Sequence, residues 1–453
     1  SDLLYAGVDV FRINLSHGEI EGNLDRLRRV REASKATGHE VAVLADLPGP
    51  KIRVCPFPEG GVEMMPGAEV TLSEAERPSS GDEICVNVVG LFTGLAEDDQ
   101  VVLGDGNIML RVTSAGGQSV IAQVVTGGRV QGAPGVHVPS ERLSASTPTP
   151  DDLLFAERMA AAGVEFIAVS FVRTARDIDE VRKVVGDQAQ LIAKIETSAA
   201  LAAITDIVST SDGVMVARGD LGIDCPLEEV PHLQKMIIRE CVERGVPVIT
   251  ATQMLESMVT SLAPTRAEAS DVANAVFDGS SAVMLSGETA VGADPTNVVR
   301  TMSRIARRAD EEMDYPGWAR RLAEMRMTDR SESTSVTDAM TMAAWRATQE
   351  LGVQNVLCIS GSGFTVRSMA RFRPEANILG FSLNEATVQQ LTLSWGTTPM
   401  LMGKGGTNEE MVAEAMRLAK SAGHIRPGEL VGVLAGSDSR AQATNVLRIE
   451  RVP

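Results

Sequence analysis

Short apolar runs that end in polar residues recur along the first two thirds of this sequence. Seven such runs span residues 8–18, 41–53, 166–173, 191–196, 213–220, 247–254 and 282–288. Amphipathic helical patterns fill the intervals, for example over residues 24–37, 175–186 and 232–245. Continuously apolar strands that alternate with helices are typical of a parallel sheet buried on both faces. The sequence therefore predicts an α/β fold built on such a sheet.

The polar residues gather at the carboxyl ends of these predicted strands, where a (β/α)₈ TIM barrel places its active site. We therefore predict a barrel of this kind. Only seven strands are found, whereas a closed barrel needs eight, and the absent strand would precede the helix that ends at "LLYAG". We expect either that the given sequence starts late and lacks the first barrel strand, or that the barrel is incomplete.

Two further regions have a different pattern. Residues 51–143 show glycine-punctuated alternation, as in "GAEVTL" and "EICVNV", which predicts a small β domain inserted beside the barrel mouth as a lid. After a polar linker, helix 338–351, strand 355–360, strand 377–382 and strand 430–436 predict an open α/β domain. The predicted domains are 1–50 with 144–325 (barrel), 51–143 (lid) and 326–453 (C-terminal domain).

Charge and cysteine content limit the classes of partner. The formal net charge is -18, and such a field repels nucleic acids and anionic membranes. The five cysteines are scattered, so the sequence predicts neither a disulfide framework nor a zinc site. With no stretch of eighteen apolar residues and no signal-peptide pattern at its start, we expect a cytoplasmic protein with no nucleic-acid or membrane partner.

Lys194 and Glu196 are two positions apart in an apolar strand and therefore share a face. Taken alone, they are best interpreted as a buried ion pair. Other predicted strand ends carry similar groups, namely Arg12, Asn14 and Ser16; Asp46; Arg218 and Asp220; Thr252; and Ser286 and Glu288. Because so many polar groups at one rim are costly to desolvate without a ligand, we interpret the rim as a site.

The residue types at this rim favour phosphoryl chemistry. Glu196 and Asp220 are hard oxygen ligands that suit Mg²⁺. Arg12 and Lys194 can neutralise a transferring phosphoryl group, and amides near Gly219 can hold a carboxylate or phosphate. From the residues alone, phosphoryl transfer stands first, and metal-assisted carbon–carbon bond chemistry on a keto acid stays open as the alternative.

Longer motifs then indicate a family. "FRINLSHG", "DLPGPKIR", "AKIE", "DGVMVARGDLG", "ATQMLESM", "PTRAEASDVANAVFDG" and "MLSGETAVG" occur in this order and closely resemble pyruvate kinase. The resemblance covers nearly the whole chain. It implies an enzyme of glycolysis, a kinase that transfers the phosphoryl group of phosphoenolpyruvate to ADP to give pyruvate and ATP, and a homotetramer.

The resemblance also implies roles for individual residues. Lys194 would stabilise the transferring phosphoryl group, Arg12 would grip the substrate phosphate, and Glu196 and Asp220 would bind Mg²⁺. Gly219, Asp220 and Thr252 would hold the substrate, with Thr252 near the site of enolate protonation. The nucleotide contacts would be Asn14, His17 and Arg53, and a second Mg²⁺ would arrive with the nucleotide.

A monovalent cation, K⁺ in the family, would be held by Asn14, Ser16, Asp46 and the carbonyl of Leu47. Here the motif reads "GPKIR", whereas potassium-dependent members resemble "GPEIR". A lysine ammonium can itself supply local positive charge. We hypothesise that Lys51 lessens or replaces the potassium requirement, and a solvated lysine at a domain hinge is the alternative.

The predicted C-terminal domain carries the loop "ISGSGFT", which resembles the family's site for phosphorylated allosteric effectors. Its amides and hydroxyls suit a phosphate, so we expect Ser360, Ser362, Gly363 and Thr365 to bind an effector phosphate, with a plain turn as the alternative. Three segments depart from the family pattern: "LAGSDSRAQATN", Thr149 where a lysine assists nucleotide binding, and Pro48. The last two departures predict weaker ADP affinity or altered lid closure.

Two other functions remain open on the sequence. One is a catalytically impaired paralogue that senses phosphorylated metabolites, suggested by the missing strand and the altered nucleotide segment. The other is a lyase acting on phosphoenolpyruvate or pyruvate, which would not need Arg53. The intact set of Lys194, Glu196, Asp220, Arg12 and Thr252 favours the kinase.

Overall fold

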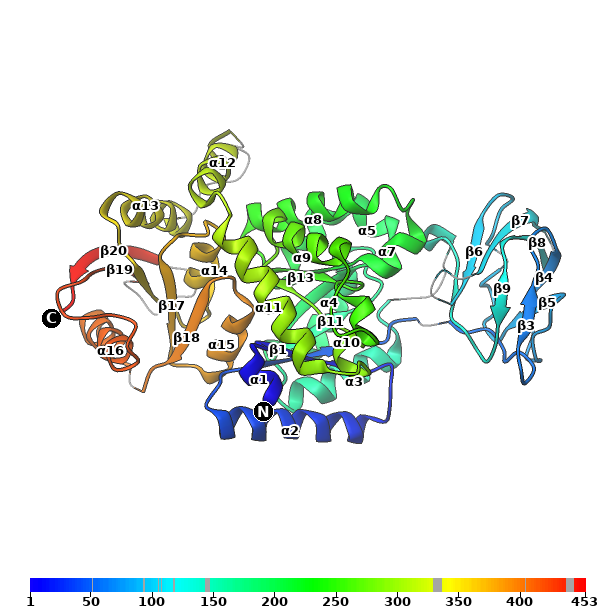
Figure 1. Cartoon of the computed structure of the whole chain (residues 1–453), viewed down its shortest axis with the longest axis horizontal. Coiled ribbons are helices and arrows are strands. Elements are labelled where there is room, and N and C mark those ends of the chain that lie inside the picture. The colour runs from blue at the N-terminus through cyan, green and yellow to red at the C-terminus, as the bar shows by residue number, and fades with distance from the viewer. Residues whose placement is uncertain are drawn as a thin grey trace.

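The structure is a computed structural model of the chain. It describes residues 1–453 except 51, 93, 105, 107, 117–118, 143–146, 329–335, 404 and 437–443. Three units follow one another along the long axis of the molecule: a small β unit, a central unit of parallel strands and helices, and a C-terminal α/β unit (Figure 1). In the described part of the chain, no helix is long and apolar enough to cross a membrane.

The central unit is a parallel sheet whose strands follow the chain in spatial order. Its members are β1 (Val10–Asn14), β2 (Ala42–Asp46), β11 (Phe166–Val169), β12 (Gln190–Ile195), β13 (Gly213–Ala217), β14 (Val248–Ala251) and β15 (Ala282–Val283). These are the seven strands predicted from the sequence. Among the described residues, β15 and β1 have no partner on their outer sides, so the barrel sheet stays open there.

Helices cover the outer face of this sheet, and the sheet curls around its other face. The inner cluster draws alternate residues from successive strands, such as Leu44, Phe166, Ile192, Met215 and Ile249. The intervening residues belong to the larger outer cluster beneath the helices. Burial of both faces explains why the strands have continuously apolar sequences.

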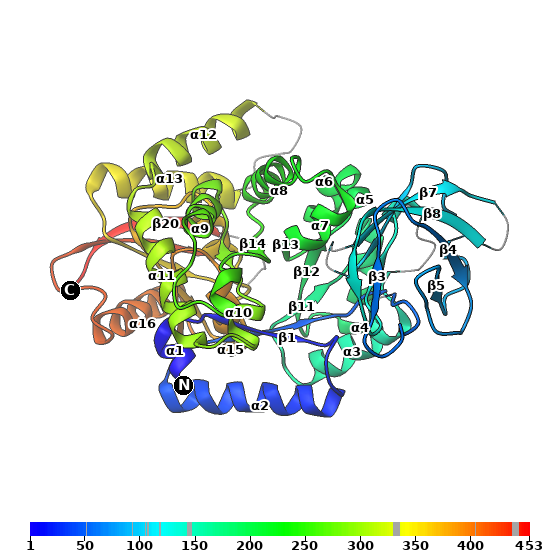
Figure 2. The ribbon, with the colours of Figure 1, turned by 45° about the vertical axis from the view of Figure 1, so that its right-hand side comes forward.

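The helices of the central unit are α1 (Asp2–Ala6), α2 (Ile20–Thr37), α3 (Pro150–Ala161), α4 (Ala175–Val185), α5 (Ser198–Ala202), α6 (Ile204–Thr210), α7 (Arg218–Asp224), α8 (Val230–Arg244), α9 (Arg266–Asp278), α10 (Gly287–Ala290) and α11 (Pro295–Glu311), with the short 3-10 helix η2 (Glu256–Val259). Figure 2 shows α1 beside α11, which it contacts, and α2 along the edge of the unit.

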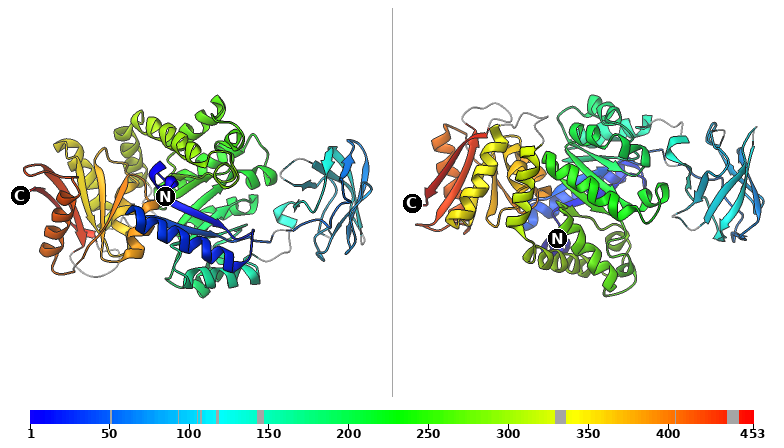
Figure 3. Two further views of the ribbon diagram at one scale, coloured as in Figure 1. Left: turned by 60° about the horizontal axis from the view of Figure 1, so that its bottom comes forward. Right: turned by 90° about the horizontal axis from the view of Figure 1, so that it is seen from above.

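The small β unit lies between β2 and α3 in the chain and has its own apolar core. Its six-stranded sheet has the order β10-β6-β7-β8-β4-β5, and β3 pairs with β9 separately. The strands are β3 (Val62–Met64), β4 (Glu69–Glu74), β5 (Glu83–Val86), β6 (Gln100–Leu103), β7 (Ile108–Ser114), β8 (Ser119–Thr126), β9 (Gly128–Val130) and β10 (Val136–His137), followed by the 3-10 helix η1 (Ser140–Arg142). Figure 3 shows this unit at one end of the molecule.

The C-terminal unit is a five-stranded sheet of order β18-β17-β16-β19-β20, with β20 antiparallel. Its elements are α12 (Tyr315–Thr328), α13 (Val336–Leu351), β16 (Asn355–Ile359), α14 (Phe364–Ala370), β17 (Asn377–Ser382), α15 (Glu385–Gln390), η3 (Leu391–Leu393), β18 (Thr397–Leu401), α16 (Asn408–Ser421), β19 (Leu430–Gly436) and β20 (Thr444–Arg451). The helix and three strands expected here are present, and β18 and β20 are additional. The domain boundaries at residues 51, 143 and 326 stay predictions.

Candidate active site

The carboxyl ends of the barrel strands open into a cavity of about 680 Å³. Residues of the small β unit, among them Arg53 and Asp98, line its opposite side. The structure brings most of the predicted site residues to this cavity, namely Arg12, Asn14, Ser16, Asp46, Leu47, Arg53, Lys194, Glu196 and Asp220. Its size suits a substrate of nucleotide dimensions.

Lys194 occupies the centre of a buried ionic cluster at this rim. Its Nζ lies 2.9 Å from Glu196 Oε1 and 3.1 Å from Asp46 Oδ1, and it donates a hydrogen bond of 2.7 Å to Ser170 Oγ. Burial opposes the charge of Lys194, but the two carboxylates outweigh it and raise the lysine pKa. The two carboxylates therefore favour the charged form of Lys194, which forms an ion pair with Glu196.

Asp46 joins this lysine to a second cation. Its Oδ2 accepts a hydrogen bond of 2.6 Å from Arg12 Nε, and the carboxylate is fully buried. Burial favours the neutral acid, but the charges of Lys194 and Arg12 together lower the Asp46 pKa. The arginine and the lysine are thus both directed to the cavity by one carboxylate.

Glu196 is electrostatically different from Asp46. Its Oε2 accepts a hydrogen bond of 2.6 Å from Phe171 N. Burial raises the Glu196 pKa to about 6; Lys194 opposes this rise, and the neighbouring charge of Asp220 adds to it. Two carboxylates that repel each other in a cavity need a cation between them, and this donor pair fits Mg²⁺, which takes one or two protein carboxylates. The described residues contain no group of three or more His, Cys, Asp or Glu arranged around a metal.

Ser170, which follows β11, was missed by the sequence interpretation. The hydroxyl accepts from Lys194 Nζ and donates to the Leu47 carbonyl at 2.7 Å. The following residue, Phe171, has a φ of 53° and directs its amide to Glu196. The available signal was the serine that follows the apolar strand in "FIAVS", two residues beyond Ala168, which pairs with Asp46.

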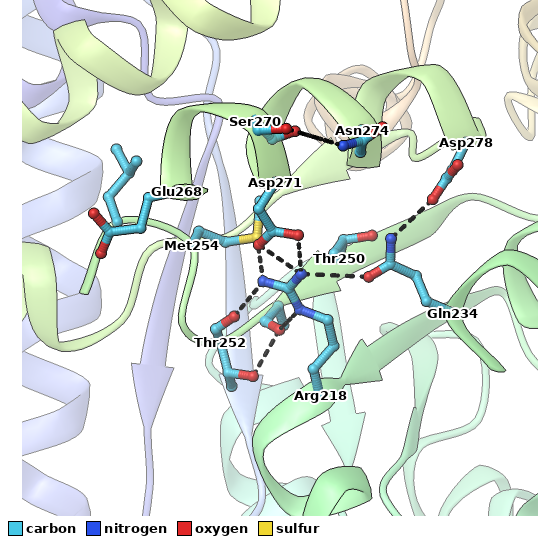
Figure 4. A network of polar contacts seen from close by, with 12 residues as sticks. Arg218, Gln234, Thr250, Thr252, Met254, Glu268, Ser270, Asp271, Asn274 and Asp278 are labelled. Atoms are coloured by element: carbon cyan, nitrogen blue, oxygen red, sulfur yellow. Dashed lines mark hydrogen bonds and ion pairs between the residues drawn. The ribbon is translucent and has the colours of Figure 1, made fainter. Parts of the chain in front are cut away.

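Arg218 does not point into the cavity, contrary to the expectation that it shares a strand face with Asp220. Strand β13 ends at Ala217, and Arg218 begins helix α7. Its guanidinium donates to Asp271 at 2.7 Å and to the carbonyl of Thr252 at 2.6 Å (Figure 4). Arg218 therefore fixes the loop after β14 and is not part of the cavity lining.

That loop holds Thr252 in a left-handed conformation, with a φ of 67°. Thr252 Oγ1 donates to the Ala251 carbonyl at 2.7 Å and accepts from Gly219 N at 2.8 Å. Gly219 and Thr252 are thus in direct contact, and neither is among the described residues that line the cavity. Ser286 and Glu288 do not line the cavity either. Glu288 is buried, and its carboxylate accepts hydrogen bonds from the backbone amides of Leu255 and Ser286.

The residues expected to hold a monovalent cation are partly engaged with protein groups. Asn14 Oδ1 accepts from Ser16 N at 3.0 Å, and the Leu47 carbonyl accepts from Ser170. Lys51 lies outside the described residues. Of the predicted nucleotide contacts, Arg53 donates to the Ala133 carbonyl at 3.1 Å, and His17 is exposed and does not line the cavity.

Two of the three departures from the family pattern can be located in the structure, whereas residues 437–443 of the third, "LAGSDSRAQATN", lie outside the described residues. Pro48 lines the cavity. Thr149 caps helix α3 and forms a capping box with Asp152, whose other oxygen accepts from Gly49 N at 3.0 Å. The altered segment thus stabilises a helix beside the rim.

The predicted effector loop lies between β16 and α14. Ser362 is exposed, and Gly363 has a φ of 75° at the start of α14. The Thr365 hydroxyl, by contrast, is buried and bonds to Thr444. The structure therefore does not bring Thr365 to the surface beside Ser362.

Comparison with known proteins shows which family the chain resembles. Residues 1–299 match the family model of the pyruvate kinase barrel domain, and residues 338–450 match that of the pyruvate kinase alpha/beta domain. A pyruvate kinase of Geobacillus stearothermophilus is 38% identical over 99% of this chain and 76% of its own length. A pyruvate kinase of Agrobacterium vitis is 38% identical over 99% of this chain and 94% of its own length.

With its barrel sheet, its cavity of paired cations and carboxylates and these matches, the chain is a phosphotransferase enzyme. It belongs to the pyruvate kinase family, as its motifs indicated. Nothing in the comparisons favours the impaired paralogue.

Proposed function

We propose that the chain transfers the phosphoryl group of phosphoenolpyruvate to ADP, giving pyruvate and ATP. In this reaction the bond between phosphorus and the enol oxygen breaks, a bond to the terminal ADP oxygen forms, and the enolate carbon takes up a proton. The observation that carries the proposal is the position of Lys194, held by ion pairs with Asp46 and Glu196 at a cavity that Arg12 also lines.

Arg12 and Lys194 are the groups that bind the phosphoryl oxygens. Negative charge spreads over these oxygens in the transition state, so two fixed cations stabilise it more than they stabilise the substrate. Asp46 holds the side chains of Arg12 and Lys194 in position before the substrate binds. Little reorganisation is then needed during the reaction.

Glu196 and Asp220 are the residues proposed to hold Mg²⁺. The ion would supply positive charge to the phosphoryl and carboxylate oxygens of the substrate. On the protein side, the two carboxylates line the same cavity, and Glu196 is buried, so a cation would offset both the burial of its charge and the repulsion from Asp220. Loss of either carboxylate would then raise the magnesium concentration needed for half-maximal activity.

Gly219 and Thr252 are proposed to hold the substrate's carboxylate and reacting end. Their mutual hydrogen bond and the left-handed conformation of Thr252 hold the two residues next to Asp220, which lines the cavity. Asn14 and Arg53 are proposed nucleotide contacts, supported by their positions on opposite sides of the cavity. His17 stays in this set on the strength of the motif alone.

The test is a lactate-dehydrogenase-coupled assay with phosphoenolpyruvate, ADP and Mg²⁺. The wild type should form pyruvate only when ADP is present. Lys194→Met should lower kcat by about 10²-fold or more, because a preorganised charge at the transferring group is lost. Lys183→Met, which removes an exposed lysine of α4, is the matched control and should keep full activity. Pyruvate formation that does not depend on ADP, or a fully active Lys194→Met, contradicts the proposal.

For the monovalent cation we keep the hypothesis that Lys51 lessens or replaces the need for K⁺. The hypothesis is supported by the contacts of the residues expected to bind K⁺. Asp46 already forms ion pairs with two cations, and the Leu47 carbonyl already accepts a hydrogen bond from Ser170. The wild type should be active in potassium-free buffer, and Lys51→Glu should become potassium-dependent. Activity that is absent without K⁺, together with an unchanged cation response in Lys51→Glu, would refute the hypothesis.

Effector binding at Ser360, Ser362 and Gly363 is a separate proposal, supported by the exposure of Ser362 and by the left-handed Gly363. A homotetramer is proposed from the family resemblance, and light scattering on the purified protein measures it.

A further inference from the structure

A second cavity, of about 30 Å³, lies at the base of the barrel, opposite the catalytic rim. The barrel lines it with residues that precede β14 and β15, including Gly245 and Gly279. The C-terminal unit contributes residues of α14 and of the segments after it. Figure 1 shows α14 and α15 on the side of the C-terminal sheet that faces the barrel. The cavity is therefore an interdomain site, remote from the chemistry.

Three arginines line this cavity, and none of the lining residues in the described part of the chain is acidic. Arg371 forms an ion pair with Asp338. Arg373 is fully buried; it donates to the Ser280 carbonyl at 2.6 Å, and its guanidinium carbon lies 5.3 Å from the Trp318 ring and 5.0 Å from the Trp395 ring. These two arginines are thus fixed in place by the protein.

Arg367 and Ser394 carry the donors that the protein does not use. Among the described residues, the buried atoms Arg367 Nη1 and Ser394 Oγ have no hydrogen-bond partner, and Ser394 is only 7% exposed. Burial lowers the Arg367 pKa, and the charge of Asp212 opposes this effect. Asp212 itself bonds to Arg182 at 2.6 Å and to Leu191 N, so its charge is shared. An unused buried guanidinium donor is costly unless a ligand satisfies it.

We propose that this interdomain cavity is a binding site for a small oxyanion, with Arg367 Nη1 and Ser394 Oγ as its direct donors. An oxyanion presents only acceptors, so it can accept from both donors at once. The volume admits one phosphate-sized group and excludes a nucleotide. The ligand is either free phosphate or the phosphoryl end of a small metabolite.

The three tryptophans of the chain provide a local signal for this binding. Trp318 and Trp395 flank Arg373, and Trp345 stacks on Phe372 with 6.4 Å between ring centroids. None of the residues that line the rim cavity is a tryptophan. Tryptophan fluorescence therefore separates binding at the base from phosphate binding at the catalytic rim.

The experiment titrates the full chain with inorganic phosphate, and separately with glycerol 3-phosphate, at constant ionic strength. A saturable fluorescence change is expected with at least one of them, and the tighter ligand identifies the source. Arg367→Gln should raise the dissociation constant about tenfold or more, since a charge-assisted hydrogen bond is lost. Arg346→Gln, an exposed arginine of α13, is the matched control. Ser362→Ala should keep the response, because Ser362 does not line the cavity, although Gly363 of the same loop lies against the Arg367 guanidinium.

Ser394→Asp provides a second test that does not depend on the stability of Arg367→Gln. The new carboxylate would occupy the cavity as an internal anion, so it should abolish the phosphate response and raise the Tm. The proposal is overturned by any of three results: no saturable response to either ligand, an equal response in Arg367→Gln, or a response lost only in Ser362→Ala. A Ser394→Asp protein that binds phosphate normally, or melts at a lower temperature, also overturns it.

Discussion

Ser170 shows how a neutral side chain can set the position of a charged one. Lys194 lies between two carboxylates that attract it in different directions, and the Ser170 hydroxyl supplies the third contact that fixes its Nζ. The same hydroxyl is held in turn by the Leu47 carbonyl. Ser170 is therefore a positioning residue for the proposed phosphoryl-binding lysine.

Replacement of Ser170 by alanine should reduce kcat about tenfold or more while KM for phosphoenolpyruvate changes less, because a misplaced Lys194 affects the transition state most. The lost hydrogen bonds should also lower the free energy of unfolding by about 1–3 kcal/mol. Steady-state kinetics and urea denaturation measure the two effects. Ser170→Thr, which keeps the hydroxyl, should recover most of kcat. A purely structural role would instead leave kcat of the folded Ser170→Ala protein unchanged.

Glu165 offers a pH test at the residue scale. It is buried at the base of β11, where it pairs with Arg31 at 2.5 Å and accepts from Val43 N at 2.6 Å. Burial raises its pKa above the ordinary value of 4.5, although Arg31 opposes the rise. The folded state thus binds the proton more tightly than the unfolded state. The resulting stabilisation is complete below pH 4.5 and is lost as pH rises through the folded pKa.

Glutamine cannot take up this proton. The free energy of unfolding of the wild type, minus that of Glu165→Gln, should therefore become more favourable to the wild type as pH falls from 8 to 4.5. Urea titrations at several pH values give this difference, with Glu350→Gln on the exposed face of α13 as the control. A difference that moves the opposite way would show that Arg31 dominates over burial.

At the scale of elements, Thr149, which stands where the family pattern has a lysine, acts as the N-cap of helix α3. Thr149 accepts from Asp152 N, and Asp152 accepts from the Thr149 amide at 2.9 Å and from the Gly49 amide of the rim loop. Thr149→Ala should lower the free energy of unfolding by about 1 kcal/mol, as loss of an N-cap does. Thr149→Ser should retain the cap. Denaturant titration of both variants checks the prediction, and equal stability of Thr149→Ala and wild type would refute it.

Sequence periodicity predicted the elements well where burial dictates the residue type. The inner strands β2, β11, β12, β13 and β14 of the central sheet have apolar sequences because both of their faces are covered, and Lys194 and Glu196 stand out against that background. Arg218 was placed wrongly because the alternation of strand side chains ends at Ala217, where the chain enters a helix. Ser170 was missed because a serine after an apolar strand is common, and its role depends on contacts with residues 24 and 123 positions away.

At the scale of the whole molecule, the rim cavity lies between two units that are separate in their cores. Barrel residues such as Lys194 form one side of it, and residues of the small β unit such as Arg53 and Asp98 form the other. A ligand that contacts both sides favours arrangements in which they approach each other. The net charge of -18 adds a reason for closure, because a phosphorylated substrate must be bound by local cations against a repulsive overall field.

Binding of phosphoenolpyruvate analogue, ADP and Mg²⁺ together should therefore reduce the radius of gyration measured by small-angle X-ray scattering. Arg53→Gln should weaken this response, because Arg53 is the proposed nucleotide contact on the β unit, so the ADP concentration at half-response should rise about tenfold. Arg129→Gln, an exposed arginine of the same unit outside the cavity lining, should respond like the wild type. A radius of gyration that stays constant at saturating ligand would contradict the prediction. It would show that the barrel and the small β unit do not approach each other when the nucleotide binds.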